Sequence, residues 1–252
     1  MHKLRLIARL DIKNEFVIKG IHLEGLRKIG DPIELAKKYY EDGIDEIVFM
    51  DAVASLYERN NLFHIIEKAC EEVFIPITIG GGIRSIGDIE KALKAGADKI
   101  ALNTQAIKTP AIVEEASRIY GSQCIVGSIE SKRKDNGSWE AYVDNGREET
   151  GVDVIEWSQR LEQLGAGELM ITCIDQEGTK KGFDNELIEI ISAAVSIPVI
   201  ASGGAGKVSH ITELVSETKA GAIAIASMLH YKMSGIKEIK QGIHQAQIPI
   251  RL

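Results

Sequence analysis

The fold of this chain is decided by a stretch that occurs twice, as PITIGGG at residues 76–82 and as PVIASGG at residues 198–204. Each copy is a short apolar run that ends in consecutive glycines, three in the first copy and two in the second. A second motif follows each copy. It reads AGADKIA at residues 95–101, and the approximately similar KAGAIAI occupies residues 219–225. Self-similarity at a nearly fixed spacing indicates an internal repeat, so we expect a chain built of two related halves.

The same kind of apolar run recurs along the whole chain. Each run is short, mostly continuous and rich in Val and Ile, which is typical of parallel strands that are covered by helices. The eight runs span residues 4–10, 46–50, 75–79, 99–102, 123–129, 168–174, 197–201 and 222–226.

Signals for helix ends lie between these runs. Asp31 directly precedes Pro32, which predicts an N-cap followed by a proline at the first helical position. Gly43, Gly96 and Gly165 each come just before the next predicted strand, where a left-handed residue commonly ends a helix. Strands and helices therefore alternate along the sequence.

Eight βα units in 252 residues correspond to about 30 residues per unit, the size of a βαβ motif. Strict alternation predicts an α/β fold with a parallel sheet, and eight units favour a closed (β/α)8 TIM barrel as one domain over residues 1–252. The repeat divides this domain into half-barrels of about residues 1–120 and 121–252. The alternative is an open dinucleotide-binding sheet, which predicts GxGxxG after the first strand, whereas residues 11–14 read DIKN.

Two segments are longer than barrel loops need to be. Residues 13–30 follow the first strand, and residues 131–151 follow the fifth, the equivalent position in the second half. In the later segment, residues 138–143 and 147–150 flank Asp144-Asn145-Gly146, which predicts a small hairpin on an Asn-Gly turn. Long loops in compact domains are usually functional, so both segments are candidates for a functional role.

Glycine pairs at two equivalent strand ends indicate two anion sites. Backbone N–H groups at glycines can approach phosphate oxygens, and the N-terminus of a following helix adds a favourable dipole. The alternative is a pair of tight turns that bind nothing. Two sites on opposite sides of one barrel mouth predict a long substrate with a phosphate at each end. The expected phosphate-binding residues are Gly81, Gly82, Asn103 and Thr104 in the first half, and Gly203, Gly204, Ala226 and Ser227 in the second.

Acidic residues also end the predicted strands, where the active site of such a barrel lies. Asp11 and Glu130 occupy equivalent positions in the two halves and should face each other, which suits general acid–base catalysis. Asp51 and Asp175 form a second pair, for which capping of the following loops is an equal alternative. Lys19 could close over a substrate as a charge partner, although a single loop lysine is more often merely solvated.

The opposite ends of the strands carry alternating charges. Side chains pointing inward there would form a ring of ion pairs across the base of the barrel, and scattered surface charge is the alternative. The residues concerned are Arg5, Glu46, Lys99 and Glu168.

Composition limits the possible partners. Thirty Lys and Arg residues against 37 Asp and Glu residues give a net charge of −7, which supports neither nucleic acid nor a membrane surface as a partner. No apolar run approaches the ~18 residues of a membrane-spanning helix. Three separated cysteines without CxxC spacing, and charges in the N-terminal MHKLRLIARLD, predict a reduced, cytoplasmic protein. The six histidines show no ligand spacing, so we expect neither a metal nor a cofactor.

Longer motifs support a family resemblance over almost the whole chain. They are DPIELA at residues 31–36, VFIP at 73–76, GGGIRS at 80–85, GSQCIV at 121–126, DQEGTK at 175–180 and IASGGAG at 200–206. On these motifs the sequence resembles the cyclase subunit of imidazole glycerol phosphate synthase, a lyase family of histidine biosynthesis.

The resemblance implies an ammonia-dependent enzyme. A glutaminase subunit of the class I amidotransferase type would dock at the N-terminal face of the barrel, and its ammonia would pass up the barrel. There it would react with a formimino-linked aminoimidazole carboxamide ribonucleotide that bears two phosphates. The products would be imidazole glycerol phosphate and the aminoimidazole carboxamide ribotide.

The resemblance also assigns roles to residues. It makes Asp11 the first catalytic acidic residue and places Glu130 at the position of the second. It also matches Lys19 to a loop lysine of the family. The four charged residues at the strand starts match the family's ammonia gate. Gly178 and Thr179 join the expected phosphate-binding residues.

Three positions depart from the family pattern. The second acid is normally Asp and here is Glu130, and a family aspartate before Gly178 is replaced by Glu177. Arg9 stands where the family usually has a small residue. It shares strand parity with Asp11 and should point into the barrel. A buried guanidinium needs a partner, which we expect to be Asp11, Asp51 or Glu130; pairing with Asp11 would partly occupy the catalytic acid.

These departures leave other functions open. A paralogous barrel could channel ammonia for sugar amidation in surface-polysaccharide biosynthesis. A non-catalytic module could activate a glutaminase through an intact gate. The isomerase that precedes the cyclase step shares the half-barrel repeat and the two-phosphate substrate, but the gate residues and residues 121–126 favour the cyclase.

Overall fold

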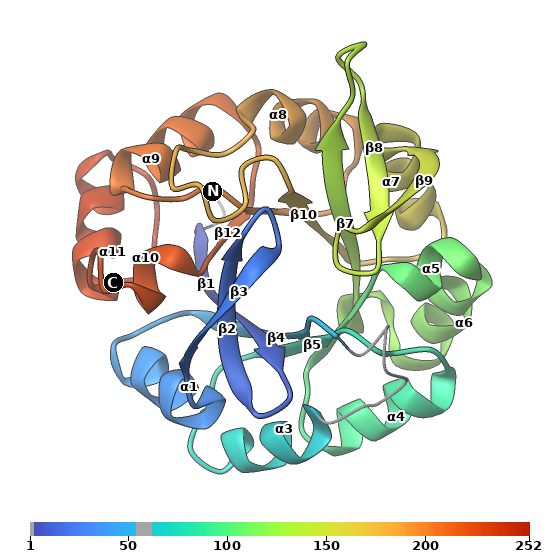
Figure 1. Cartoon of the computed structure of the whole chain (residues 1–252), viewed down its shortest axis with the longest axis horizontal. Coiled ribbons are helices and arrows are strands. Elements are labelled where there is room, and N and C mark those ends of the chain that lie inside the picture. Colours follow the sequence, from blue (N-terminus) through green and yellow to red (C-terminus); the bar gives the residue numbers. More distant parts are fainter. Residues whose placement is uncertain (1–2, 54–61) are drawn as a thin grey trace.

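A computed structural model describes residues 3–53 and 62–252, and it contains a closed parallel barrel (Figure 1). Each barrel strand is hydrogen-bonded to a parallel neighbour on both sides. The barrel strands, in order around the barrel, are β1 (Arg5–Lys13), β4 (Glu46–Asp51), β5 (Ile77–Gly80), β6 (Lys99–Leu102), β7 (Ile125–Arg133), β10 (Glu168–Cys173), β11 (Val199–Ser202) and β12 (Ala222–Ile225).

Two pairings close the ring. β12 pairs with β1, with Ala222 opposite Arg5, and β10 pairs with β7, with Glu168 opposite Val126. The predicted (β/α)8 TIM barrel is therefore confirmed, and the open doubly wound alternative is excluded, because an open sheet would leave two strands with one neighbour each.

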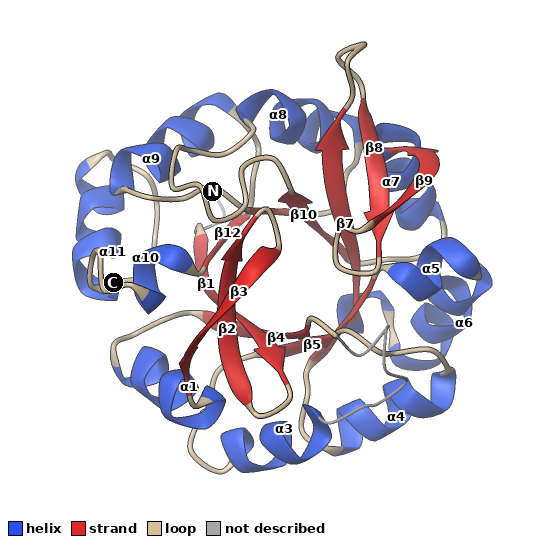
Figure 2. Cartoon of the chain, viewed as in Figure 1, coloured by secondary structure: helices blue, strands red, loops and turns tan. Residues whose placement is uncertain are grey.

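Helices surround the barrel on its outside (Figure 2). Their apolar faces pack on the outer faces of the strands, which explains why the strands read as continuous apolar runs. Within the described ranges they are α1 (Pro32–Glu41), α3 (Leu62–Cys70), α4 (Ile86–Lys94), α5 (Thr104–Lys108), α6 (Ala111–Tyr120), η1 (Ser122–Cys124), α7 (Val154–Gln163), α8 (Asn185–Ala194), α9 (Val208–Glu217), α10 (Ser227–His230) and α11 (Ile236–Gln245). None of these helices is long and apolar enough to cross a membrane.

The helix ends follow the predicted chemistry. The side chain of Asp31 accepts hydrogen bonds from the N–H groups of Ile33 and Glu34, with Pro32 at the first helical position. Asp153, at the equivalent place in the second half, caps α7 in the same way. The glycines predicted to end helices at positions 43, 96 and 165 all have positive φ, at 93°, 109° and 96°.

Two antiparallel ribbons extend the barrel at its carboxyl-terminal mouth. The predicted hairpin on Asp144-Asn145-Gly146 is present as β8 (Trp139–Val143) and β9 (Glu148–Asp153), and β8 pairs with the prolonged end of β7. Residues 13–30, expected as a long loop, instead form β2 (Phe16–Ile21) and β3 (Glu24–Gly30), which pair with each other and with the end of β1. Backbone pairing thus gives this segment a defined shape over the mouth.

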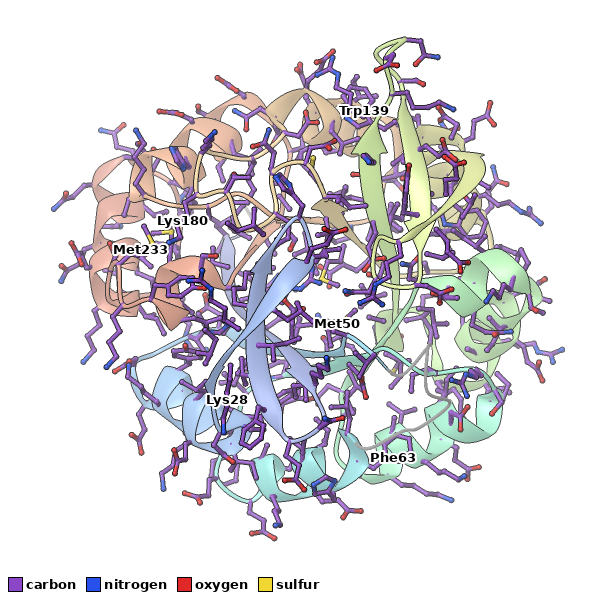
Figure 3. All side chains as sticks on the ribbon, in the orientation of Figure 1. Lys28, Met50, Phe63, Trp139, Lys180 and Met233 are labelled. Carbon is purple, nitrogen blue, oxygen red and sulfur yellow. The ribbon has the colours of Figure 1, made fainter. Side chains whose placement is uncertain are left out.

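The barrel interior is layered along its axis. At the base lie the four residues that we call the charged ring: Arg5, Glu46, Lys99 and Glu168. Above it lies an apolar layer, which includes Met50 near the centre of the view in Figure 3. The apolar layer comprises Ile7, Val48, Met50, Ala101, Val126, Met170, Ile200, Ala222 and Ala224. Inward-pointing side chains alternate along each strand, so the polar residues Arg9, Asp11 and Glu130 follow at the mouth.

Candidate active site

Asp11 and Glu130 lie inside strands rather than at strand ends. The sequence placed them at the ends of the first and fifth strands, but β1 continues to Lys13 and β7 to Arg133. The extra residues pair with β2 and β8, so each acid marks the level at which the barrel strand becomes a hairpin. Both carboxyl groups are almost fully buried.

Arg9 points into the barrel, as strand parity predicts, and its partner is Asp11. The Nε of Arg9 donates a hydrogen bond of 2.8 Å to Oδ1 of Asp11. Its Nη1 donates to Oγ1 of Thr172 at 2.7 Å and to Oγ of Ser202 at 3.2 Å. Burial alone would raise the pKa of Asp11, but the positive charges of Arg9 and Lys19 outweigh it and hold that pKa below its usual range. Asp11 is therefore an ionised carboxylate near neutral pH.

Lys19 is buried rather than solvated. It lies on β2, its ammonium contacts the carboxylate of Glu177, and its Nζ is 3.6 Å from Oδ2 of Asp11. Burial lowers the pKa of Lys19 to about 8, although Asp11 acts in the opposite sense. The β2–β3 hairpin thus places the ammonium of Lys19 beside the second carboxylate oxygen of Asp11.

Glu130 stands in a different environment. One of its oxygens, Oε2, accepts hydrogen bonds from Nδ2 of Asn103 at 3.0 Å and from the N–H of Gly146 at 2.8 Å. Burial raises the pKa of Glu130 to about 7, against the opposing effect of Arg9. Two carboxyl groups at one mouth therefore differ in protonation, because one is paired with cations and the other is desolvated.

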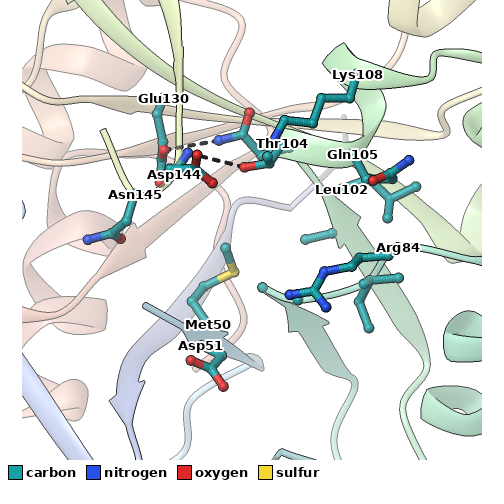
Figure 4. Close-up of a pocket in the computed structure, with 15 residues that line it drawn as sticks. Met50, Asp51, Arg84, Leu102, Thr104, Gln105, Lys108, Glu130, Asp144 and Asn145 are labelled. Carbon is teal, nitrogen blue, oxygen red and sulfur yellow. Dashed lines mark hydrogen bonds between the residues drawn. The ribbon is translucent and has the colours of Figure 1, made fainter. Parts of the chain in front are cut away.

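The predicted phosphate-binding residues of the first half line one pocket beside Glu130 (Figure 4). Gly81 and Gly82 have φ of 87° and 70°, and a Cβ at Gly81 would lie 2.3 Å from the carbonyl oxygen of Asp51. Only glycine fits such a turn. Asn103 and Thr104 line the same pocket, and the hydroxyl of Thr104 accepts a hydrogen bond from the N–H of Asp144.

The second-half residues are brought together by strand pairing and by a loop. β11 and β12 pair with Ser202 opposite Ala224, so Gly203 and Ala226 leave neighbouring strands. The loop after β10 packs on Gly204, whose carbonyl accepts a hydrogen bond from the N–H of Gly182. Gly178 lies in this loop with φ of 75°.

Three predicted phosphate-binding residues of the second half, Gly178, Thr179 and Ser227, have different surroundings. A Cβ at Gly178 would lie 2.2 Å from the carbonyl oxygen of Gly20, so Gly178 packs against the β2–β3 hairpin. The hydroxyl of Thr179 donates to the carbonyl oxygen of Gln176 at 2.8 Å. Ser227 is buried at the first position of α10.

The four residues of the charged ring contact one another in a closed circuit. Nη1 of Arg5 lies 2.7 Å from Oε1 of Glu46, and Nζ of Lys99 lies 3.1 Å from a carboxylate oxygen of both Glu46 and Glu168. An ion pair between Arg5 and Glu168 completes the circuit. The ring of ion pairs predicted from the strand starts is present, with each acid touching both cations.

Comparison with known proteins identifies the family. The model of the family described as histidine biosynthesis protein matches residues 5–234. The chain is 59% identical over 210 residues to the imidazole glycerol phosphate synthase subunit HisF of Legionella pneumophila, covering 83% of this chain and 99% of that protein. It is 45% identical over 249 residues to the HisF subunit of Lactococcus lactis subsp. cremoris strain SK11, covering 98% and 96%. The chain belongs to the HisF family.

Membership of the HisF family confirms the resemblance drawn from the motifs. It favours the cyclase subunit over the isomerase and over the polysaccharide-associated paralogue, because both relatives carry the HisF name over almost their full length.

Asp51 makes a hydrogen bond of the capping kind, whereas Asp175 bonds to the neighbouring strand β7. Oδ1 of Asp51 accepts from the N–H of Val53, two residues further on, at 3.0 Å. Oδ2 of Asp175 accepts from the N–H of Arg133 at 2.8 Å and so ties the β10 loop to β7. In this member of the HisF family, both residues hold backbone at the mouth.

Several site residues were not predicted. Arg84 and Lys108 line the first pocket, where Arg84 points its guanidinium inward in Figure 4. Asn145 lines both this pocket and a second one beside Asp11 and Lys19. The Asn-Gly signal predicts the turn, but only the fold shows that the turn bends back over the HisF barrel mouth.

His230 is a further buried residue that the sequence did not single out. Its Nδ1 lies 2.8 Å from the hydroxyl of Tyr39, and burial lowers the pKa of His230 to about 4. It is therefore neutral near pH 7. Among the described residues, no cluster of His, Cys, Asp or Glu has the arrangement of a metal site.

Proposed function

We propose that this chain catalyses the ammonia-dependent cyclase step of histidine biosynthesis. The substrate is a formimino-linked aminoimidazole carboxamide ribonucleotide with two phosphates. The products are imidazole glycerol phosphate and the aminoimidazole carboxamide ribotide. Asp11 and Glu130 act as base and acid on the middle of this substrate.

The observation that carries the proposal is the contrast between the surroundings of the two buried carboxyl groups. Asp11 is paired with Arg9 and Lys19. Glu130 instead accepts hydrogen bonds from Asn103 and from the N–H of Gly146. Asp11 is held ionised by two cations, whereas Glu130 keeps its proton to about pH 7. Adding ammonia to a carbon centre and expelling a leaving group require one group that accepts a proton and one that donates it. Two carboxyl groups with separated pKa values supply both roles at one pH.

The phosphates of this substrate are assigned to the two glycine-rich ends. In the first pocket, Gly81 and Gly82 offer backbone N–H groups, Asn103 and Thr104 offer polar side chains, and Lys108 adds positive charge. In the second half, Gly203 and Gly204 take the same role with Ala226 and Ser227 at the start of α10, and the Gly178–Thr179 loop flanks them. This arrangement holds anions with few charged side chains, which fits the acidic net charge of the chain.

The opposite face is assigned to a glutaminase partner. Phe74 and Ile119 lie shortly before β5 and β7, at the base of the barrel, and their side chains are 75% and 50% exposed. Exposed large apolar residues are typical anchors of protein interfaces. We assign the charged ring to this face as the gate, and the apolar layer above it as the part of the barrel that neutral ammonia would have to pass.

A related function remains a second candidate because of Arg9. A barrel that channels ammonia for sugar amidation would share the ring and the apolar layer but would need different groups at the mouth. The Arg9–Asp11 pair and the longer second acid, Glu130, are such changes. Rescue of a histidine auxotroph by this chain would eliminate this candidate.

Turnover with ammonia tests the proposal directly. Purified chain is given the formimino substrate and an ammonium salt at alkaline pH, and both products are quantified. We expect turnover that Asp11→Asn abolishes, and glutamine should replace the ammonium salt when a glutaminase partner is added. A chain that never consumes the substrate, even with a partner, contradicts the proposal; stimulation of the glutaminase that survives Asp11→Asn would instead indicate a non-catalytic activator.

A further inference from the structure

Arg9 is held inside the barrel from three strands. Its guanidinium donates to Asp11 on its own strand β1, to Thr172 on β10 and to Ser202 on β11, and the residue is 2% exposed. These contacts fix both the position and the plane of the guanidinium. Because Nε is the donor to Oδ1 of Asp11, they also fix the orientation of that carboxylate.

Stability does not explain this arrangement. A buried ion pair is roughly neutral in stability, or worse, when compared with apolar side chains of similar volume. The apolar layer directly below Arg9 shows that this barrel fills its interior with apolar side chains at the neighbouring level. A charged pair at the level of the mouth therefore points to a chemical role.

The charges around Asp11 show which group controls its ionisation. Arg9 is within 2.8 Å of one carboxylate oxygen, whereas Lys19 is 3.6 Å from the other and also contacts Glu177. His230 is a weaker influence and is neutral near pH 7. The titratable and charged groups facing the two acids are Arg9, Lys19, Glu177 and His230 around Asp11, and Arg9, Asp11 and Asp144 around Glu130.

We propose that Arg9 is a positioning residue that fixes Asp11 as the proton acceptor of the reaction and thereby leaves the proton-donor role to Glu130. The inference rests on the proposed function for its catalytic consequence, but the orientation and ionisation of Asp11 can be tested in the free protein. Arg9 does not touch the substrate in this scheme and acts through Asp11.

The first test is a titration of the carboxyl carbons by NMR, with Asp11→Asn and Glu130→Gln used to assign the two signals. Replacing Arg9 by Met removes the charge and keeps an unbranched side chain. In Arg9→Met the titration midpoint of Asp11 should rise by about one pH unit or more, and that of Glu130 should rise as well, because both acids lose a nearby cation. In Arg9→Lys, which keeps a positive charge, the midpoint of Asp11 should lie between those of Arg9→Met and the wild type. Arg133→Met is the matched control on an exposed arginine.

The second test is the pH profile of kcat/KM for the bisphosphate substrate with an ammonium salt as nitrogen source. At each pH the rate is divided by the concentration of unprotonated ammonia. In Arg9→Met the whole profile should move to higher pH, because the base and the acid both gain pKa. A merely structural role would lower the height of the profile and leave its two limbs in place. Unchanged limbs in a folded, active Arg9→Met would overturn the inference.

The two tests separate failure of the inference from failure of the proposed function. If the wild-type chain has no turnover, the proposed function fails, and the NMR titration still decides the control of Asp11. If Arg9→Met does not fold, Arg9→Gln removes the charge and keeps hydrogen-bonding atoms that can face Thr172 and Ser202. An Asp11 midpoint that stays at its wild-type value in every folded variant rejects the role of Arg9.

Discussion

Arg9 and Asp11 lie two residues apart on one strand, and the Nε of the first donates a 2.8 Å hydrogen bond to Oδ1 of the second. Side chains two residues apart on a strand point to the same side, so the pair is local in sequence and buried in the fold. Across the mouth, burial keeps the proton on Glu130 to about pH 7, although the charge of Arg9 acts to lower that pKa.

Replacing Glu130 by Gln removes the proton donor and preserves the size of the side chain. We expect kcat with ammonia to fall by about 10²–10⁴-fold, the usual contribution of a general acid. In the wild type, the rate per free ammonia should decline above about pH 7, as Glu130 loses its proton. Steady-state kinetics measure both effects, with Glu114→Gln on the exposed face of α6 as the control. A Glu130→Gln variant as fast as the wild type would exclude Glu130 as the donor.

The same residue should make folding stability depend on pH. The pKa of Glu130 rises from an ordinary 4.5 to about 7 on folding, so between these values the unfolded chain releases a proton that the folded chain keeps. The stabilisation is complete below pH 4.5 and is lost as the pH rises through about 7, a change of about 3 kcal/mol. Denaturant unfolding at several pH values gives the free energy of unfolding of the wild type and of Glu130→Gln. The difference between the two values at each pH is the contribution of Glu130. A constant difference across that window would be incompatible with a buried, protonated Glu130.

The charged ring should be sensitive to loss of one acid. In Glu46→Gln, Arg5 and Lys99 share the single remaining carboxylate of Glu168, and the loss of charged hydrogen bonds should cost roughly 2 kcal/mol. The exposed pair of Glu90 and Lys94 offers the matched control, because solvent screens an exposed ion pair and Glu90→Gln should therefore have a much smaller effect. Thermal unfolding compares the two variants. Equal losses would show that the ring is no more coupled than a surface pair.

Ser227 tests the second phosphate site. Ser227→Ala removes one hydroxyl at the start of α10, and the loss of about 0.5–1.5 kcal/mol should raise KM for the bisphosphate substrate by about 2–13-fold with little change in kcat. Ser216→Ala serves as the control. The hydroxyl of Ser216 is exposed on α9 and donates to the backbone carbonyl oxygen of Glu213 in the same helix. A Ser227→Ala variant with wild-type KM would place the phosphate elsewhere.

Asp31 tests the cap of α1 separately from function. Its carboxylate accepts two backbone hydrogen bonds at the start of the helix, so Asp31→Ala should lower the free energy of unfolding by about 1 kcal/mol. Asp31→Asn keeps an acceptor and should lose less. Activity at the mouth should not change, since the cap stands outside the barrel. A much larger kinetic effect than stability effect would contradict this assignment.

Strand periodicity was sufficient to predict the barrel, but turn chemistry predicted the β8–β9 hairpin and not the β2–β3 hairpin. The β8–β9 turn contains Asn145-Gly146, a strong local signal. The β2–β3 turn places His22 and Leu23 at φ of 51° and 62°, where no glycine or asparagine marks it. Its shape comes from contacts with other segments, such as the hydrogen bond from the N–H of His22 to the carbonyl oxygen of Glu177.

The site shows a similar division. Parity along β1 predicts that Arg9 points inward, but the choice of Asp11 over Asp51 or Glu130 depends on distances between strands. Thr172 and Ser202, which complete the contacts of Arg9, are far away in sequence. The raised pKa of Glu130 depends on burial under the Asp144–Gly146 turn, and no local pattern reports that burial.

The repeat gives the Arg9 position a meaning beyond its own half of the barrel. Two residues before Glu130, at the place that corresponds to Arg9, the second half carries Ser128, also buried. A barrel of two equal halves would present the same groups to both ends of a bisphosphate and could hold it in either direction. Arg9 places a cation on one side of the mouth and Ser128 a hydroxyl on the other, so the two sides are chemically different. On the proposed function, this polarity makes one orientation of the substrate productive.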